Sequence, residues 1–242
     1  MFVFKPKYAV AFAVLFVCVA GGVFSVIVEK KDAPVWSEES RTVDVVILDA
    51  GHGGADGGTV GRAGTVEKDL NLEIALLTRE FCDILGVETV LTREEDVSLG
   101  SGDTLRRQKI NDLKKRVDIA NRTEQGVLIS IHQNYFDDYV SRGAQVFYAP
   151  GNPYGKTMAL RMQSLLKEFC GGENKRTAMA IPNGNYMLEN LACPAIIIEC
   201  GFLSHLEEEM LLNSPEYRAK IAFAVAAGAM ECVAGGIEPD LQ

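Results

Sequence analysis

Residues 43–54 read Val43-Asp44-Val45-Val46-Ile47-Leu48-Asp49-Ala50-Gly51-His52-Gly53-Gly54, a β-branched apolar run that passes into a glycine-rich segment. A short, nearly continuous apolar run of this kind is typical of a strand buried on both faces of a sheet. After the glycines, apolar residues recur at near-helical spacing from Glu67 to Leu85, and Gly86 ends the pattern. These residues therefore predict a strand, a loop and a helix as the first unit of the fold.

The same alternation of strand-like and helix-like segments continues along the chain. We expect helices at 105–123 and 154–169, one or two more between 206 and 233, and strands at 87–92, 127–131, 144–148 and 195–199. Alternating strands and helices with short connections predict an α/β fold, with a mostly parallel, twisted sheet and helices on both of its faces. Because ligands bind at the carboxyl ends of the strands in such sheets, the residues just after each strand are expected to carry the chemistry.

A single catalytic domain is expected at residues 43–235, preceded by a charged linker at 29–42 and followed by a short tail at 236–242. A hydrophobic content of 48% and a net charge of -9 indicate an ordinary globular protein without a basic face, so nucleic acid is not an expected partner. The cysteines show no paired or metal-type spacing, and most are expected to be buried, unpaired side chains.

The N-terminal segment is strongly apolar. Residues 8–28 form a run of 21 residues without a charge, which is long enough to span a bilayer. Lys5 and Lys7 favour keeping residues 1–7 in the cytoplasm and sending the rest across. A cleaved signal peptide, cut near residues 18–20, is the alternative, although its apolar run is usually only about 7 to 15 residues long. Either way we expect an exported domain, anchored to the membrane or secreted.

Three of the expected strand ends carry polar side chains that suit metal chemistry. His52 and His132 follow two of the strands, Glu199 ends the last one, and Glu67 opens the first helix directly after the loop that holds His52. Two histidines and one glutamate are a known ligand set for a catalytic zinc ion, which keeps one position open. We therefore expect Zn²⁺ at His52, Glu67 and His132, with Glu199 as the carboxylate that moves protons.

Each of these residues alone has an ordinary structural explanation. A histidine after a strand is more often a hydrogen-bonded structural residue, and Glu67 can simply favour the N-terminus of its helix. Glu199 can be a buried carboxylate held by backbone donors. The glycine pattern after the first strand resembles part of a dinucleotide fingerprint, but it lacks the third glycine, so nucleotide binding is not expected. The expected convergence of all four residues at one sheet edge favours the metal site.

Six segments carry a more specific signal. They are Leu48 to Gly58, Glu67 to Leu72, Thr92-Arg93, Arg116 with Ala120-Asn121, Ser130 to Asn134, and Ile198 to Ser204. In this order, over about residues 43–235, they resemble the zinc-dependent N-acetylmuramoyl-L-alanine amidases. The short N-terminal anchor, the single domain, the extra segment at 100–109 and the strand at 143–148 are most similar to the spore-cortex, germination-specific branch of that family.

The resemblance implies roles, a substrate and a partner. In the family, the residues matching His52, Glu67 and His132 bind zinc, and the one matching Glu199 is the catalytic acid and base. The implied substrate is peptidoglycan of the spore cortex, cleaved at the amide between muramic acid and L-alanine before the sugar becomes muramic-δ-lactam. Some clostridial relatives are helped by a lipoprotein. A regulatory lipoprotein is therefore an expected partner, although no residue of this chain identifies it.

Two features depart from the family pattern. His205 stands where the family usually has asparagine, and we expect a surface residue at a helix start there rather than a neighbour of the metal. Cell-division relatives carry an inserted blocking helix, for which residues 150–158 are too short. Two rival functions remain open: an exported zinc peptidase acting on a peptide bond, and a catalytically inactive module that only binds the cell wall.

Overall fold

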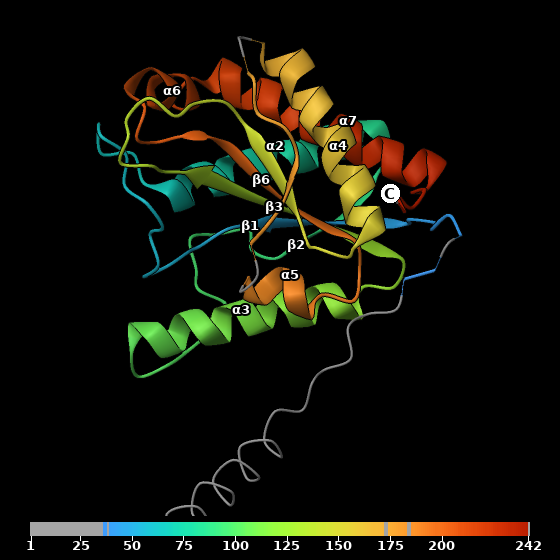
Figure 1. The fold of residues 1–242 in the computed structure, drawn as a ribbon. Coiled ribbons are helices and arrows are strands. Elements are labelled where there is room, and N and C mark those ends of the chain that lie inside the picture. The colour runs from blue at the N-terminus through green and yellow to red at the C-terminus, as the bar shows by residue number, and fades with distance from the viewer. Residues whose placement is uncertain (1–35, 38, 172–173, 183–184, 242) are drawn as a thin grey trace, which may run out of the picture. The chain divides into compact units, whose positions relative to one another are not determined.

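The computed structural model describes residues 36–37, 39–171, 174–182 and 185–241 (Figure 1). The apolar segment expected at 8–28, residues 1–7 that we expect in the cytoplasm, and residues 29–35 of the expected linker lie outside these ranges. Within the described ranges, no helix has the length and apolar character needed to cross a membrane. The compact unit that contains them runs from Trp36 to Gln242.

A six-stranded sheet with the order β2-β1-β3-β6-β4-β5 forms the centre of this described unit. Its strands are β1 (Val45–Ala50), β2 (Glu88–Leu91), β3 (Gly126–Asn134), β4 (Gln145–Tyr148), β5 (Met179–Ala180) and β6 (Ala195–Phe202). Strands β2, β1, β3 and β6 are parallel to one another, whereas β4 runs antiparallel to β6 and parallel to β5. The expected mostly parallel sheet is confirmed.

Helices cover both faces of the sheet, which confirms the α/β class (Figure 1). One face carries α2 (Glu67–Leu85), α4 (Pro153–Cys170) and α7 (Pro215–Gly235). The other face carries α3 (Leu105–Arg122) and the short α5 (Tyr186–Asn190). Helix α6 (Leu206–Leu212) follows β6 and leads into α7.

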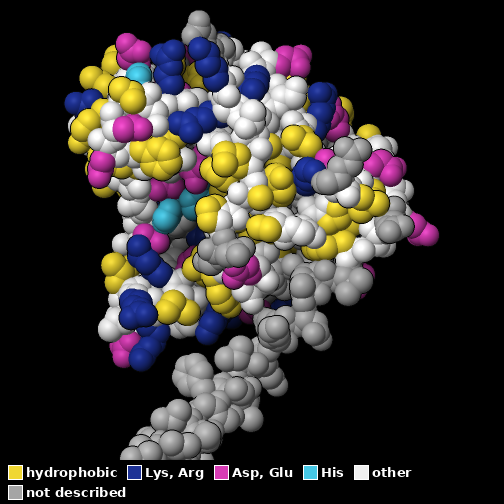
Figure 2. Space-filling model, in the orientation of Figure 1, with side chains coloured by type: hydrophobic (Ala, Val, Ile, Leu, Met, Phe, Trp, Pro, Cys, Tyr) yellow, Lys and Arg dark blue, Asp and Glu magenta, His cyan; other side chains and the backbone are white. Residues whose placement is uncertain are grey.

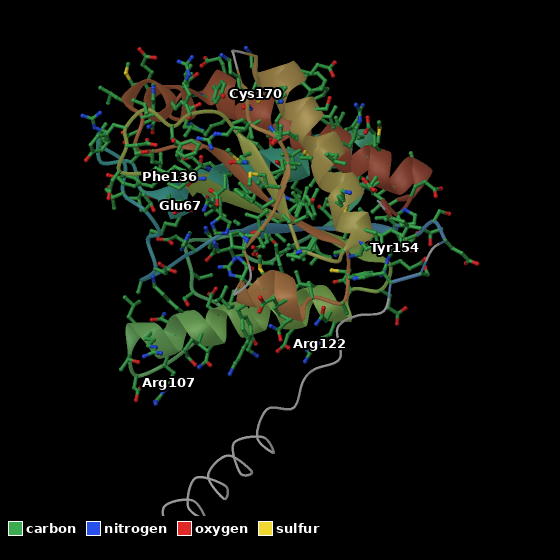
Figure 3. All side chains as sticks on the ribbon, in the orientation of Figure 1. Glu67, Arg107, Arg122, Phe136, Tyr154 and Cys170 are labelled. Atoms are coloured by element: carbon green, nitrogen blue, oxygen red, sulfur yellow. The ribbon has the colours of Figure 1, made fainter. Side chains whose placement is uncertain are left out.

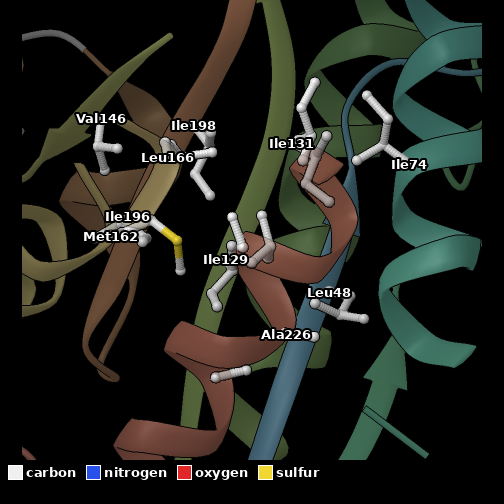
Figure 4. Close-up of a cluster of buried hydrophobic side chains, with 14 of the residues drawn as sticks. Leu48, Ile74, Ile129, Ile131, Val146, Met162, Leu166, Ile196, Ile198 and Ala226 are labelled. Atoms are coloured by element: carbon white, nitrogen blue, oxygen red, sulfur yellow. The ribbon is translucent and has the colours of Figure 1, made fainter. Parts of the chain in front are cut away.

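Successive strand residues enter two separate apolar cores. Leu48 and Ile131 pack with α2, α4 and α7, as the close-up in Figure 4 shows. Ile47, which precedes Leu48 on β1, and Leu128, which shares β3 with Ile131, point to the opposite face and pack with α3 and α5. Side chains alternate between the faces of a strand, so burial on both faces requires an apolar residue at nearly every position. This requirement explains why the strands are visible in the sequence as uninterrupted apolar runs.

Local sequence signals set the ends of the helices. The side chains of Thr104, Asn152 and Ser214 accept hydrogen bonds from backbone N–H groups in the first turns of α3, α4 and α7. A proline follows two of these caps, where its missing N–H group is not needed. Gly86 ends α2 in the left-handed conformation, with a φ of 72°.

Residues on both sides of the predicted domain limits pack on the folded unit. The ring of Trp36 meets Tyr154 edge-on at 5.8 Å between centroids, and the Tyr154 hydroxyl donates to the carbonyl oxygen of Glu39 at 2.6 Å. The backbones of Arg41 and Ile237 form an antiparallel bridge, and Ile237 is buried. The compact unit is therefore longer than residues 43–235, which we keep as the proposed catalytic core.

The described cysteines fit the expectation of unpaired side chains. Cys82, Cys193 and Cys200 are buried, Cys170 and Cys232 are partly buried, and all five are free. Burial raises the pKa of the Cys82 thiol to about 12 and that of Cys193 to about 11. These thiols therefore stay protonated at neutral pH and behave as small apolar groups.

Candidate metal centre

The carboxyl ends of β1, β3 and β6 meet at one edge of the sheet, and four polar side chains gather there. His52 follows β1, His132 and Glu199 are register neighbours on the parallel strands β3 and β6, and Glu67 is the first residue of α2. Figure 3 places Glu67 at this end of the strands and Tyr154 at the other. Figure 2 shows histidine side chains open to the surface in a recess bordered by charged groups.

Three of these side chains are spaced as ligands of one metal ion. Atoms of His52, Glu67 and His132 that could bind a metal all lie within 4.8 Å of one another. Oε1 of Glu67 lies 3.2 Å from Nε2 of His52 and 3.0 Å from Nδ1 of His132. Two ligand atoms on one tetrahedral zinc ion lie about 3.3 Å apart, given bond lengths of about 2.0 to 2.1 Å. The donor types and their spacing therefore both fit zinc.

Backbone contacts hold His52 in an uncommon conformation. Its φ is 62°, in the left-handed region that non-glycine residues rarely occupy. The guanidinium of Arg116 donates to the carbonyl oxygen of His52 at 2.6 Å, and that of Arg93 donates to the carbonyl oxygen of Gly51 at 3.1 Å. Nδ1 of His52 lies 3.0 Å from Oδ2 of Asp56. A carboxylate on this nitrogen orients the ring and leaves Nε2 turned toward Glu67.

Glu67 is held as a charged carboxylate at the centre of the group. Its Oε2 accepts a hydrogen bond from the backbone N–H of Thr59 at 2.8 Å, and its Oε1 accepts one from Gln133 at 3.1 Å. Burial alone would raise the pKa of Glu67, but hydrogen bonds and charges from His132 and His52 hold it well below its usual range. An ionised carboxylate between two imidazoles is the state that a cation requires.

Two glycines leave the space that these side chains occupy. A Cβ atom on Gly51 would lie 2.2 Å from Cε1 of His132, and one on Gly58 would lie 2.5 Å from Oε2 of Glu67. Gly58 also has a φ of 68°, which a side chain would strain. The glycine-rich loop therefore lets the backbone pass close to two candidate ligands.

A buried ion pair lies beneath the loop that carries His52. Asp49 and Arg116 are 1% and 2% exposed, and Oδ1 of Asp49 lies 2.5 Å from Nη1 of Arg116. Asp49 also accepts hydrogen bonds from Thr92 at 2.7 Å and from Ser130 at 2.6 Å. Burial by itself would raise the pKa of Asp49, but Arg116 and these two hydroxyl groups lower it to about 2. The pair therefore stays ionised and ties β1 to α3 and β3.

Glu199 lies beside His132 but outside the group of three candidate ligands. Its Oε2 is buried and has no hydrogen-bond partner among the described residues. Burial, together with the charge of Glu67, raises the pKa of Glu199 to about 7, against the opposing effect of His132 and His52. A carboxyl group with a pKa near neutrality can both take up and return a proton, which is the property of a general acid and base.

Comparison with known proteins identifies the family of this fold and site. The N-acetylmuramoyl-L-alanine amidase family, Amidase_3, matches residues 46–231. The chain belongs to this amidase family. The match begins in β1 and ends in α7, so it includes all four side chains of the candidate metal centre.

Similar amidases include a germination-specific one. The germination-specific N-acetylmuramoyl-L-alanine amidase of Bacillus subtilis is 36% identical over 186 residues, which cover 76% of this chain and 77% of that protein. The amidase AmiA of Escherichia coli is 27% identical over 228 residues, covering 76% and 74%. These similarities agree with the germination-specific branch that the sequence predicts.

Solved amidase structures share the fold. The CwlD amidase of Clostridioides difficile, in complex with the GerS lipoprotein, superposes with a TM-score of 0.75 at 35% identity, covering 79% of this chain and 98% of that one. The catalytic domain of the amidase CwlV of Bacillus (Paenibacillus) polymyxa gives 0.68 at 29% identity, covering 79% and 99%.

The amidase domain brings together the four residues that the sequence singled out, while their individual roles stay predictions. His205 lies elsewhere, as the cap of α6, where its Nδ1 accepts from the backbone N–H of Glu208 at 3.4 Å. Sequence reasoning assigned no role to Asp49, Arg116 or Asp56. A charged residue inside or beside an apolar strand was the available signal for Asp49, but its partner on α3 is visible only in the fold.

Proposed function

We propose that this protein is a zinc-dependent N-acetylmuramoyl-L-alanine amidase that hydrolyses the amide between N-acetylmuramic acid and L-alanine in peptidoglycan. The observation that carries the proposal is the placement of a protonatable carboxyl group, Glu199, on the strand next to a candidate two-histidine, one-glutamate metal site. Membership of the amidase family supplies the class of bond. Hydrolysis at such a site needs both a metal and a group that moves protons.

The chain's own residues would divide the work. His52, Glu67 and His132 would hold zinc, which supplies Lewis acidity to the amide carbonyl when it is bound. Glu199 would take a proton from the attacking water and give it to the amide nitrogen as the C–N bond breaks. Its raised pKa of about 7 suits both transfers. The two histidine side chains are 24% and 22% exposed, which leaves the site open to a polymeric substrate.

The proposal includes an exported enzyme that acts on the spore cortex. Support comes from the 36% identity to the germination-specific amidase of Bacillus subtilis and from the likeness to the CwlD amidase. The CwlD structure contains the GerS lipoprotein, so a lipoprotein of similar kind is the regulatory partner we propose. Residues 8–28 would carry the chain across the membrane as an anchor or a cleaved signal.

Digestion of purified cortex peptidoglycan, followed by mass analysis, separates this function from its rivals. An amidase releases whole stem peptides and leaves muramic acid without its peptide. A zinc peptidase would shorten the stems while their first residue stays on the sugar, and a binding module would release nothing. Either of the last two results with zinc-loaded protein would contradict the proposal. The variant Glu199→Gln serves as the matched control, because it removes the proton-moving group without removing a candidate ligand.

A further inference from the structure

A buried glutamine lies beside Glu199, on the side of the site away from His52. Strand β4 runs antiparallel to β6, with Gln145 directly opposite Glu199. Side chains in that relation project from the same face with their Cβ atoms about 4.5 to 5.5 Å apart. Gln145 is 4% exposed, and its Nε2 donates to the carbonyl oxygen of Thr177 at 3.0 Å. This bond turns its Oε1 toward the neighbouring Arg176, 3.4 Å from Nη1.

Arg176 is held in place by contacts that leave much of its charge unsatisfied. Its Nε donates to the carbonyl oxygen of Arg142 at 3.1 Å, and its guanidinium stacks on the ring of Phe202 at 4.6 Å from the centroid. Among the described residues no carboxylate forms an ion pair with it. The charge of Arg176 acts on Asp138, but the oxygens of that carboxylate already accept hydrogen bonds from Ser141 and Val140. A fixed guanidinium of this kind suits an incoming carboxylate.

The direction of the substrate follows from the proposed function, on which this inference rests. The leaving amine takes its proton from Glu199 on β6, so the peptide portion must begin there. The sheet order then continues outward from β6 to β4, which carries Gln145, and Arg176 lies beside Gln145 on the segment that precedes β5. Neighbouring strands are about 4.8 Å apart and one extended residue spans about 3.4 Å. We therefore expect the second residue of the peptide to come within reach of the Arg176 guanidinium, which lies next to Gln145.

We propose that Arg176, positioned by Gln145, binds a free carboxylate on the residue that follows L-alanine in the stem peptide. Peptidoglycan stems carry an acidic second residue joined through its side chain, which leaves its α-carboxylate free. The contact selects stems in which this group is charged over stems in which it is amidated. Glu199 then acts on the amide at one end of a peptide whose second residue is held by Arg176.

Two soluble substrates test the inference. N-acetylmuramoyl-L-alanyl-D-isoglutamic acid and its D-isoglutamine counterpart differ only in the charge of this carboxyl group. The wild-type enzyme should prefer the acid by about 10-fold or more in kcat/KM, the range expected for a charge-assisted hydrogen bond. Arg176→Gln should abolish the preference by raising KM for the acid alone, and Arg176→Lys should keep part of it. Arg161→Gln, which breaks an ion pair with Glu231 on the surface of α4, is the control and should keep the full preference.

The outcomes distinguish a failure of the Arg176 inference from a failure of the proposed amidase function. Release of peptide from both substrates at equal kcat/KM by the wild-type enzyme overturns the inference alone. A loss by Arg176→Gln that is equal for both substrates also overturns it, because it indicates a structural role for the arginine. Release from neither substrate by protein that does release stem peptides from cortex peptidoglycan overturns the inference alone, whereas no release from cortex either overturns the proposed function and the inference with it. If the variants do not fold, the wild-type comparison of acid and amide still decides.

Discussion

Glu67 and Glu199 share one edge of the sheet, yet their surroundings give the two carboxyl groups opposite proton affinities. Two imidazoles and two backbone N–H groups surround Glu67, and its pKa lies well below the usual range although burial opposes this. Glu199 is half-buried, its Oε2 is buried with no hydrogen-bond donor among the described residues, and its pKa is raised to about 7. When the surroundings move the pKa values of two carboxyl groups in opposite directions in this way, one group suits the role of metal ligand and the other that of proton carrier.

Substituting each glutamate by glutamine tests this division. Glu199→Gln should retain zinc and lose peptide release by about 10²-fold to 10⁴-fold, the usual contribution of a general acid and base. Glu67→Gln should lose zinc itself, because a neutral amide replaces the charged ligand. Metal content measured by atomic emission, together with the rate of peptide release, checks both. Unchanged hydrolysis by Glu199→Gln would remove this residue from the mechanism.

At the scale of elements, the end of β1 and the glycine-rich loop build the site together. Arg116 on α3 donates to the carboxylate of Asp49 and to the carbonyl oxygens of Ala50 and His52, so one buried side chain holds the end of β1 and the start of the loop. The ring of His132, on β3, lies directly over Gly51. Strand, loop and helix therefore fix the candidate ligands before any metal binds, which lowers the entropy lost on binding.

A methyl group at Gly51 should disturb this arrangement although all three candidate ligand residues stay unchanged. In Gly51→Ala the added Cβ would overlap the ring of His132, so the ring must move away from Glu67. We expect zinc affinity to fall by at least about 10-fold, the effect typical of displaced supporting groups around a metal. Competition with a fluorescent zinc chelator measures the affinity. Gly57→Ala, in the same loop, is the matched control, because its φ lies outside the left-handed region and its Cβ would meet only the side chain of Val66, at 3.4 Å.

The buried pair of Asp49 and Arg116 predicts how stability depends on pH. The pKa of Asp49 is lowered to about 2 in the folded chain, below its value of about 3.9 in an unfolded one. The carboxylate therefore contributes roughly 2 kcal/mol to stability above about pH 4, and this contribution is lost as pH falls toward about 2. The free energy of unfolding, measured with urea at pH values from roughly 2 to 6, should show this loss, because the carboxylate titrates in that range. In Asp49→Asn the corresponding part of the pH dependence should be absent, and an unchanged curve would contradict the assignment.

For the molecule as a whole, most of the fold could be predicted because a strand buried on both faces needs a continuous apolar run, and a helix buried on one face needs an apolar period. Strand β1 and helix α2 are examples, since an apolar run and an apolar period respectively extend over their full lengths. Strand β5 and helix α5 were not predicted, because two and five residues are too short to show a period. Helix α5 exists because Met187 and Leu188 pack into the second core, which only the folded chain brings together.

The candidate site divides in the same way. His52, Glu67, His132 and Glu199 could be predicted because each lies at or near the carboxyl end of a strand, or opens a helix, at the edge where α/β sheets bind ligands. The residues that hold them in place could not. Arg116 reaches Asp49 across 67 positions of sequence, and the place of Gln145, with Arg176 beside it, depends on the antiparallel pairing of β4 with β6. Such pairings come from tertiary structure and leave no local pattern.

X-ray diffraction at the zinc absorption edge, on crystals of the zinc-loaded protein, would locate the metal ion itself. The proposed zinc site predicts one anomalous peak at about 2.0 to 2.2 Å from Nε2 of His52, Nδ1 of His132 and the carboxylate of Glu67, with Glu199 nearby but not bound. A peak held by other side chains, or no peak at this edge of the sheet, would contradict it.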